Sequence, residues 1–202
     1  MKRLLTLLSA MAAVAAATTL AGTATADDTI RTPGAHLKYA LEGEVHGLWG
    51  WTDYGYADGG GLGIGGRISV PIVDNGFVPS INNSVAISAG LDWLSYGGPG
   101  CYHFNGTCYG AGSADYIFIP VVMQWNFYVA KRWSVFGEPG VAIYHLFYSN
   151  PCDGIAGCNY PGPTVTSLTP VFYAGARYQI TDHLAVVMRV GYPTISVGVS
   201  FM

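Results

Sequence analysis

The stretch Val85-Ala86-Ile87-Ser88-Ala89-Gly90-Leu91-Asp92-Trp93 decides the fold class. Its odd positions are apolar, whereas its even positions are small or polar. Because successive side chains of a strand point to opposite faces of a sheet, this period of two predicts a strand with one apolar and one polar face. The same alternation runs from Leu62 to Ile72 and from Ile195 to Phe201. The chain is therefore expected to be built from two-faced strands.

The same alternation, followed along the whole chain, predicts eight strands. They cover residues 36–51, 60–72, 83–96, 114–129, 133–148, 168–180, 184–191 and 194–202. The connections at one end are mostly short turns, and those at the other end are longer and rich in Gly, Pro, Asn and aromatic residues. The longer ones are 52–59, 97–113 and 149–167. Short turns at one end and long loops at the other predict an all-β, eight-stranded antiparallel up-and-down transmembrane β-barrel.

Composition favours an exported membrane protein. The basic start Met1-Lys2-Arg3, an apolar run to Ala21 and small residues to Ala26 have the pattern of a secretory signal peptide. We therefore expect a signal peptide at 1–26 and a barrel domain at 27–202. The domain has seven Lys and Arg against twelve Asp and Glu, which disfavours nucleic-acid binding. Charged residues are 10% of the chain, too few for the wet outer face of a soluble sandwich.

Two features complicate the strand assignment. The apolar phase changes at Gly191–Thr194, which fits either a tight turn or a bulge in one long strand, and an even strand number favours the turn. Pro120, Pro139 and Pro170 fall inside predicted strands. A closed barrel has no free edge, so each proline is expected at a bulge or a strand end.

Charged residues of the predicted strands fall on the face opposite the apolar one. They are Lys38, Glu42, Glu44, Arg67, Asp92, Glu138, Arg177 and Arg189. An eight-stranded barrel is just wide enough for side chains to fill its interior, and charges buried there need partners. Four positive and four negative charges therefore predict ion pairs that close the lumen. A proton or ion path through the same residues is the alternative.

Tryptophans lie near the ends of the predicted strands. They are Trp49, Trp51 and Trp93 toward the long loops, and Trp125 and Trp133 toward the short turns. Indole rings favour the boundary between membrane and water. We expect two aromatic belts in contact with outer-membrane lipids.

Four cysteines are the most specific local feature. Cys101 and Cys108 lie in one long loop, and Cys152 and Cys158 lie in the next. An even number in an exported chain predicts disulfides. The local pairs Cys101–Cys108 and Cys152–Cys158 would each close a short glycine-containing loop. A bond between the two loops, such as Cys101–Cys158, and metal binding are the alternatives.

The whole pattern resembles small outer-membrane barrels of the OmpA/OmpX/OmpW type. The resemblance rests on the signal segment, the eight strands, the loop lengths and the ending Ile195-Ser196-Val197-Gly198-Val199-Ser200-Phe201-Met202, and it covers residues 27–202 without a specific motif. Such proteins commonly end in a terminal aromatic residue that the barrel-assembly machinery reads, whereas here Phe201 is penultimate. The resemblance implies an outer-membrane location and that machinery as a partner. It implies no single activity.

The sequence contains few residues in the pattern of an enzyme active site. His145 and Ser149 lie near the end of a predicted strand, and eight-stranded lipid-A deacylases use a surface His and Ser with a nearby acid. No acid can be assigned here, and a nucleophile needs a base and an orienting group. The glycines from Gly59 to Gly66 are not followed by a helix, which disfavours a phosphate loop. We expect no catalysis, no cofactor and no metal.

These observations predict a structural or surface-interaction role. An extracellular partner would meet the loops at 97–113 and 149–167, and the lumen would be closed. A narrow channel or carrier for small apolar molecules is the second hypothesis, and a membrane-embedded lipid-modifying enzyme is the third. A soluble exported barrel that binds a hydrophobic ligand is the non-membrane alternative.

Overall fold

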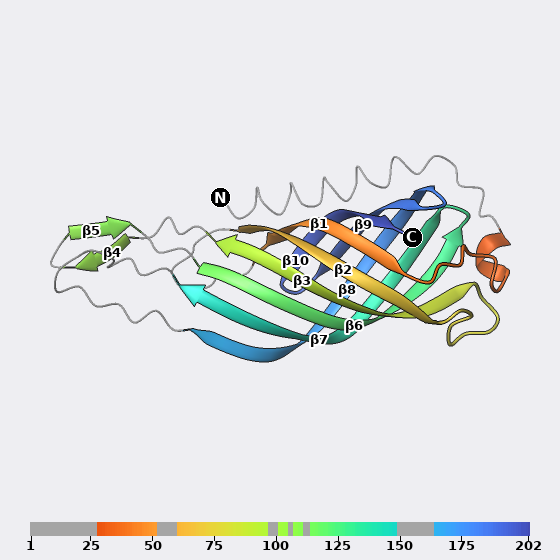
Figure 1. The fold of residues 1–202 in the computed structure, drawn as a ribbon, viewed down its shortest axis with the longest axis horizontal. Coiled ribbons are helices and arrows are strands. Elements are labelled where there is room, and N and C mark those ends of the chain that lie inside the picture. Colours follow the sequence, from red (N-terminus) through yellow and green to blue (C-terminus); the bar gives the residue numbers. More distant parts are fainter. Residues whose placement is uncertain (1–27, 52–59, 97–100, 105–106, 111–113, 149–163) are drawn as a thin grey trace, which may run out of the picture.

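The computed structural model describes residues 28–51, 60–96, 101–104, 107–110, 114–148 and 164–202 (Figure 1). A short 3-10 helix, η1 (Asp28–Arg31), comes first, and the hairpin strands β4 (Cys101–Phe104) and β5 (Thr107–Gly110) pair only with each other. The remaining strands form a closed barrel. They are β1 (Glu42–Gly50), β2 (Gly61–Val73), β3 (Asn83–Tyr96), β6 (Ala114–Ala130), β7 (Trp133–Tyr148), β8 (Val165–Thr181), β9 (Leu184–Gly191) and β10 (Thr194–Phe201).

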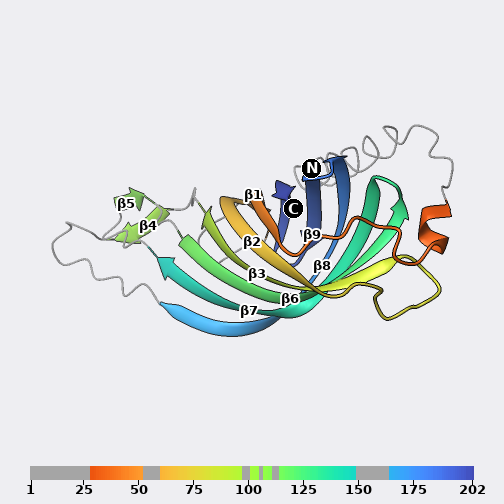
Figure 2. The ribbon, with the colours of Figure 1, turned by 45° about the vertical axis from the view of Figure 1, so that its right-hand side comes forward.

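Each barrel strand pairs antiparallel with the next barrel strand along the chain, and β1 closes the barrel by pairing with β10. The strands run obliquely around the barrel in both views (Figure 1 and Figure 2). This confirms the predicted eight-stranded up-and-down barrel. The first predicted strand began too early, because β1 starts at Glu42 rather than at residue 36. No helix in the described part of the chain is long and apolar enough to cross a bilayer.

Large apolar side chains cover the outer wall. Leu62, Ile64 and Leu168 expose 70%, 66% and 63% of their surface. Exposed apolar patches on soluble proteins rarely exceed a few hundred Å², whereas an apolar band is what the outer wall of a membrane barrel presents to lipid. The alternate positions point inward and are mostly buried. The apolar positions of the sequence alternation therefore form the lipid-facing wall, and the alternate positions fill the lumen.

Two ends of the barrel can be distinguished. One end carries the two-residue turns β6–β7 and β8–β9, the helix η1 and Met202. Backbone hydrogen bonds fix η1 and the β6–β7 turn to the barrel, with Asn82 N before β3 donating to Ile30 O at 2.7 Å and Gln179 N of β8 donating to Arg132 O at 2.8 Å. Short turns mark the periplasmic side of outer-membrane barrels, so we call this the periplasmic end. The opposite end is called the extracellular end.

On one side of the barrel, the strands β9 and β10 are shorter than their neighbour β8, so the wall extends less far at the extracellular end. β9 and β10 have eight residues each, whereas β8 has 17. Pairing between β8 and β9 begins at Tyr173 opposite Gly191, so residues 165–172 of β8 lie beyond the end of β9. β9 and β10 pair antiparallel on either side of Tyr192 and Pro193. The phase change is therefore a turn, as the even strand number favoured.

The prolines are accommodated differently from the expectation. The β3–β6 ladder has no pair at Pro120 and the β6–β7 ladder has none at Pro139, yet the register is the same on both sides of each gap. A proline has no N–H to donate, so each ladder is interrupted for two residue pairs without a bulge, and the expected bulge or strand end is wrong at these two positions. Pro170 lies in the part of β8 beyond β9, where no pairing on that side is lost.

Candidate functional site

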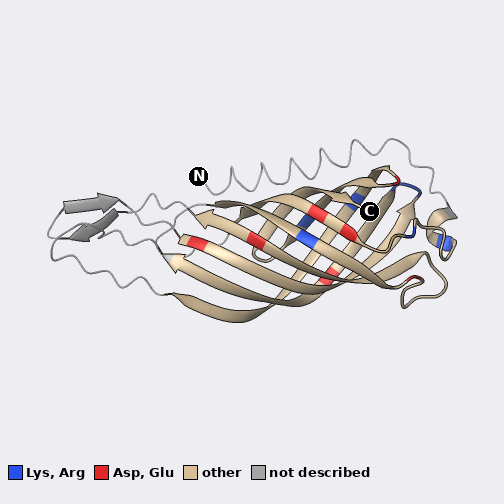
Figure 3. Cartoon of the chain, in the orientation of Figure 1, with Lys and Arg blue, Asp and Glu red and all other residues tan. Residues whose placement is uncertain are grey.

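The candidate site is a layer of charged side chains inside the barrel. Each comes from an inward position of a strand, and each is at most 6% exposed. Figure 3 shows acidic and basic residues on the strands between the two ends of the barrel. The members are Glu42, Glu44, His46, Arg67, Asp92, Glu138, Arg177 and Arg189. We call this set the lumen charge layer.

Glu138 is the centre of the layer and is fully buried. Arg67 Nη1 donates to its Oε2 atom at 2.8 Å, and Arg189 Nε lies 3.0 and 3.1 Å from the two carboxylate oxygens. Gln124 Nε2 donates to Oε1 at 3.0 Å. One carboxylate thus joins strands β2, β6, β7 and β9 across the lumen. Charged hydrogen bonds of this kind are among the stronger ones in proteins.

His46 lies between two carboxylates. Its Nε2 atom is 2.9 Å from Asp92 Oδ1, and its Nδ1 atom is 3.0 Å from Glu44 Oε1 without the alignment of a hydrogen bond. Arg189 Nη1 bonds to Glu44, and Arg67 Nη2 is 3.8 Å from Asp92 Oδ2. Both ring nitrogens carry a hydrogen only in the imidazolium form, the form that these two carboxylates match. Three arginines and one such histidine would then balance four carboxylates.

A second group closes the layer toward the periplasmic end. Arg177 Nη2 donates to Glu42 Oε2 at 2.7 Å, and its Nη1 atom donates to Asn126 Oδ1 at 3.4 Å. Tyr39, which precedes β1, donates its hydroxyl to Glu42 Oε2 at 3.1 Å. Burial raises the pKa of the Tyr39 phenol above its usual value, so it keeps the proton that it donates. Arg177 also stacks over Phe136, 5.6 Å from the ring centre.

Lys38 does not belong to the layer, and its predicted place in the lumen is wrong. It precedes β1, so the alternation that was applied to it does not hold there. Lys38 Nζ lies 3.3 Å from Asp74 Oδ2, and both side chains are 65% exposed. His46 takes the place of the missing cation. Its even position, shared with Glu42 and Glu44 in β1, was the signal that could have identified it.

A glycine makes room for the histidine–aspartate pair. A Cβ atom at Gly65 would lie 2.1 Å from Asp92 Oδ1 and 2.6 Å from His46 Nε2. Such contacts are far shorter than real Cβ atoms show, so a larger residue would displace the pair. Gly65 on β2 is thus required by packing against the charge layer.

The extracellular part of the lumen has a different chemistry. Two apolar clusters fill it, one around Leu48, Leu94 and Leu146 and the other around Phe118 and Val171. A cavity of about 120 Å³ lies among these side chains. Its walls are Leu94, Tyr96, Tyr116, Phe118, Tyr144, Thr169, Tyr192 and Pro193. The last two belong to the turn at the low side of the wall.

The tryptophans predicted for the membrane boundary lie near the strand ends. Trp49, Trp51, Trp93 and Trp133 are 39–48% exposed, whereas Trp125 is half-buried and donates through Nε1 to Asn83 Oδ1 at 3.0 Å. An exposed indole at a strand end suits the headgroup region. Contact of these rings with lipid remains a prediction.

The remaining candidate residues are not brought together in the described part of the chain. His145 bonds through Nδ1 to the hydroxyl of Thr166, and Ser149 lies outside the described residues. Cys152 and Cys158 lie outside them as well. The backbone register of the β4–β5 hairpin places Cys101 opposite Gly110 and Cys108 opposite His103, but the side chains there are not described. The disulfides remain predictions.

Comparison with known proteins agrees with the fold. No protein-family model matches the sequence, and no curated protein matches it. The outer membrane protein OprG of Pseudomonas aeruginosa aligns with a TM-score of 0.52 and 10% identity, over 84% of this chain and 98% of OprG. Ail, the attachment invasion locus protein of Yersinia pestis, solved in complex with the heparin analogue sucrose octasulfate, aligns with a TM-score of 0.50 and 12% identity, over 80% of this chain and 95% of Ail.

Both similar structures are outer-membrane or attachment proteins of bacteria. At such low sequence identity, the alignments support a shared fold and not a shared activity. The apolar outer wall described above is the independent physical indication of a lipid environment. The chain therefore has the fold of the small eight-stranded outer-membrane β-barrels, and its apolar outer wall matches a lipid environment.

Proposed function

We propose that the protein is a sealed outer-membrane barrel that acts through its extracellular surface rather than by passing polar solutes. The lumen charge layer carries this proposal. Its ion pairs connect β1, β2, β3, β7, β8 and β9 inside the barrel. A hydrated ion on its way through would have to separate buried ion pairs, and a buried charge that has lost its partner is strongly unfavourable.

Conductance in planar bilayers tests the sealed lumen. The wild-type barrel is expected to give no steady current, because its charges are paired with one another. The double variant Arg67→Ala/Glu138→Ala removes two interacting members together and is expected to conduct. Heat-modifiable migration on gels shows whether each variant is folded. A large steady current through the folded wild type would contradict the proposal.

The surface role would use the segments that connect the strands at the extracellular end. Binding sites are commonly carried by loops on a rigid scaffold, and the charge layer makes this barrel rigid. Residues 51–60, 97–113 and 149–164 contain no Lys or Arg. A sulfated polyanion such as the one bound to Ail needs cationic side chains. We therefore propose a neutral or cationic partner for this chain.

Replacement of residues 97–113 by a short Gly-Ser turn tests the surface role. Bacteria that display the altered barrel are expected to lose attachment to surfaces that the wild type binds. Lys38→Gln, a change at the opposite end, serves as the control and is expected to have no effect. Equal attachment by all three strains would refute the surface role for this segment.

A second candidate function is a carrier for small apolar molecules, and the cavity beside Tyr192 and Pro193 favours it. The cavity volume of about 120 Å³ is close to that of an engineered cavity of about 150 Å³ that binds benzene. Thr169→Phe is expected to fill the cavity. Uptake of a small aromatic compound by cells would then fall if the barrel is a carrier, and would be unchanged if the cavity is only a packing defect.

A further inference from the structure

Among the described residues, the Lys and Arg side chains outside the lumen all lie at one end of the barrel. After Ala26 the sequence has seven Lys and Arg residues, of which Arg67, Arg177 and Arg189 are buried in the charge layer. The other four are Arg31, Lys38, Lys131 and Arg132. Arg31 lies in η1, Lys38 lies in the segment before β1, and the last two form the β6–β7 turn. The periplasmic end is therefore the cationic end of the barrel.

Lys131 and Arg132 differ from Lys38 in their surroundings. Lys38 has a carboxylate partner in Asp74. Among the described residues, neither Lys131 nor Arg132 lies within ion-pair distance of an acidic side chain, although both are exposed. Their turn is fixed to the barrel, because Gln179 N donates to the carbonyl oxygen of Arg132 at 2.8 Å. Within the described residues, the backbone of this turn is thus fixed, whereas its two neighbouring cationic side chains have no acidic partner.

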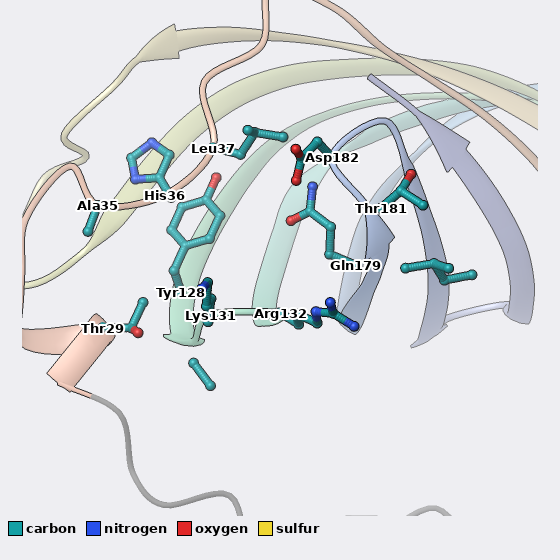
Figure 4. A pocket seen from close by; sticks show the side chains of 12 residues that line it. Thr29, Ala35, His36, Leu37, Tyr128, Lys131, Arg132, Gln179, Thr181 and Asp182 are labelled. Atoms are coloured by element: carbon teal, nitrogen blue, oxygen red, sulfur yellow. The ribbon is translucent and has the colours of Figure 1, made fainter.

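These two residues line a large pocket at the periplasmic end (Figure 4). The pocket has a volume of about 590 Å³, which is within the range of about 300–1,000 Å³ of ligand sites. Figure 4 shows Lys131 and Arg132 at one side of the pocket and His36 and Leu37 at the other. We call it the periplasmic-mouth pocket.

The pocket lining is amphipathic. Leu37 and Ile180 contribute apolar side chains that are 38% and 43% exposed. Thr29 and Gln179 add a hydroxyl and an amide that can donate hydrogen bonds. Asp182 is the acidic member of the lining. A ligand that suits two unpaired cations, hydrogen-bond donors and an apolar wall has an anionic head and a hydrocarbon portion.

The position of the pocket relative to the membrane indicates the source of such a ligand. Trp133 directly follows Arg132 and is 41% exposed, with its ring 4.9 Å from that of Tyr178. Trp and Tyr side chains mark the level of the lipid headgroups. Basic residues next to this level attract anionic lipids. The unpaired cations therefore lie where the headgroups of the periplasmic leaflet are.

We propose that the periplasmic-mouth pocket binds the headgroup of an anionic phospholipid from the periplasmic leaflet. The phosphate contacts Lys131 and Arg132, the glycerol lies near Thr29 and Gln179, and the first part of an acyl chain follows Ile180 toward the outer wall. A guanidinium binds phosphate oxygens in a fork and a lysine acts as a point charge. The site is independent of the proposed extracellular role.

Native mass spectrometry of the purified full-length barrel, with phosphatidylglycerol and phosphatidylcholine supplied at equal concentrations, tests the proposal. The wild type is expected to retain phosphatidylglycerol at least fivefold better. The double variant Lys131→Gln/Arg132→Gln is expected to lose this preference. Lys38→Gln is the matched control, because it removes an exposed cation at the same end that already has a partner, and it is expected to bind as the wild type does.

Three outcomes would overturn the proposal. The first is equal retention of the two lipids by the wild type, and the second is an unchanged preference in the double variant. The third is competition by soluble glycerol phosphate at the concentration at which phosphatidylglycerol binds, since the site would then recognise a free phosphate and not a lipid. Heat-modifiable migration of every variant confirms that the barrel is folded.

Discussion

The two halves of the lumen follow the same alternation and fill the barrel in different ways. Toward the periplasmic end, Glu138, Arg67 and their partners make a connected layer of ion pairs. Toward the extracellular end, Leu48, Leu94 and Leu146 pack in an apolar cluster that adjoins a cavity of about 120 Å³. An ion pair fixes the distance and orientation of two particular side chains, whereas apolar packing is not directional and tolerates gaps. We therefore expect the charged half to define the register and seal the lumen, and the apolar half to be more tolerant of change.

The largest effect is expected from Arg67→Ala in the charged half. It leaves Glu138 without its 2.8 Å partner and Asp92 without its nearest guanidinium. Loss of one member of a buried pair costs about 3–5 kcal/mol. The free energy of unfolding in urea, followed by tryptophan fluorescence, measures it. Lys38→Ala is the control, since an exposed pair contributes about 0–1 kcal/mol. Equal destabilisation by the two variants would show that the charge layer does not stabilise the barrel.

Leu146→Ala tests the apolar half. Leu146 is 5% exposed and belongs to the cluster with Leu48 and Leu94. Large-to-small changes of this kind cost about 2–5 kcal/mol, and less where the site can relax. We expect a value near the lower limit because the cavity next to the cluster leaves room for repacking. The same urea titration measures it, and a loss larger than that of Arg67→Ala would reverse the ranking of the two halves.

Gly65→Ala tests the space that the charge layer requires. The added methyl group would lie 2.1 Å from Asp92 Oδ1, so the His46–Asp92 pair must shift. Overpacking typically costs about 1–3 kcal/mol. Gly43→Ala is the matched control on the neighbouring strand, because a Cβ there meets nothing within 4 Å. The difference between the two midpoints in urea is the measured quantity, and no difference would mean that the pair adjusts freely.

The smallest effect is expected from Ser69→Ala. Ser69 Oγ donates to Ser88 Oγ at 2.9 Å inside the barrel. A neutral buried hydrogen bond contributes about 0.5–1.5 kcal/mol. The double variant Ser69→Ala/Ser88→Ala is expected to recover part of the loss, because it leaves no unpaired hydroxyl. Thermal unfolding on gels compares Ser69→Ala, Ser88→Ala and the double variant with the wild type, and a double variant less stable than either single variant would contradict this account.

Much of the fold could be predicted from short-range patterns. Alternation in β2, β3 and β10 placed the apolar residues on the outer wall, as the exposed Leu62, Leu91 and Phe201 show. The prediction failed where no strand existed, at Lys38, because parity has a meaning only inside a strand. It also failed at Pro120, where the ladder is interrupted for two residue pairs and keeps its register. Neither failure changes the number or order of the strands.

The sequence by itself determined the strands and their two faces, because these depend on a period of two. Only the tertiary structure decided which charges meet. Arg177 bonds to Glu42 across 135 positions of sequence and Arg189 bonds to Glu44 across 145. These contacts arise when β1 closes on β10 and the tilted strands bring distant residues to one level of the lumen. The physical reason is that periodicity is local, whereas the stagger of a closed barrel is a property of all its strands together.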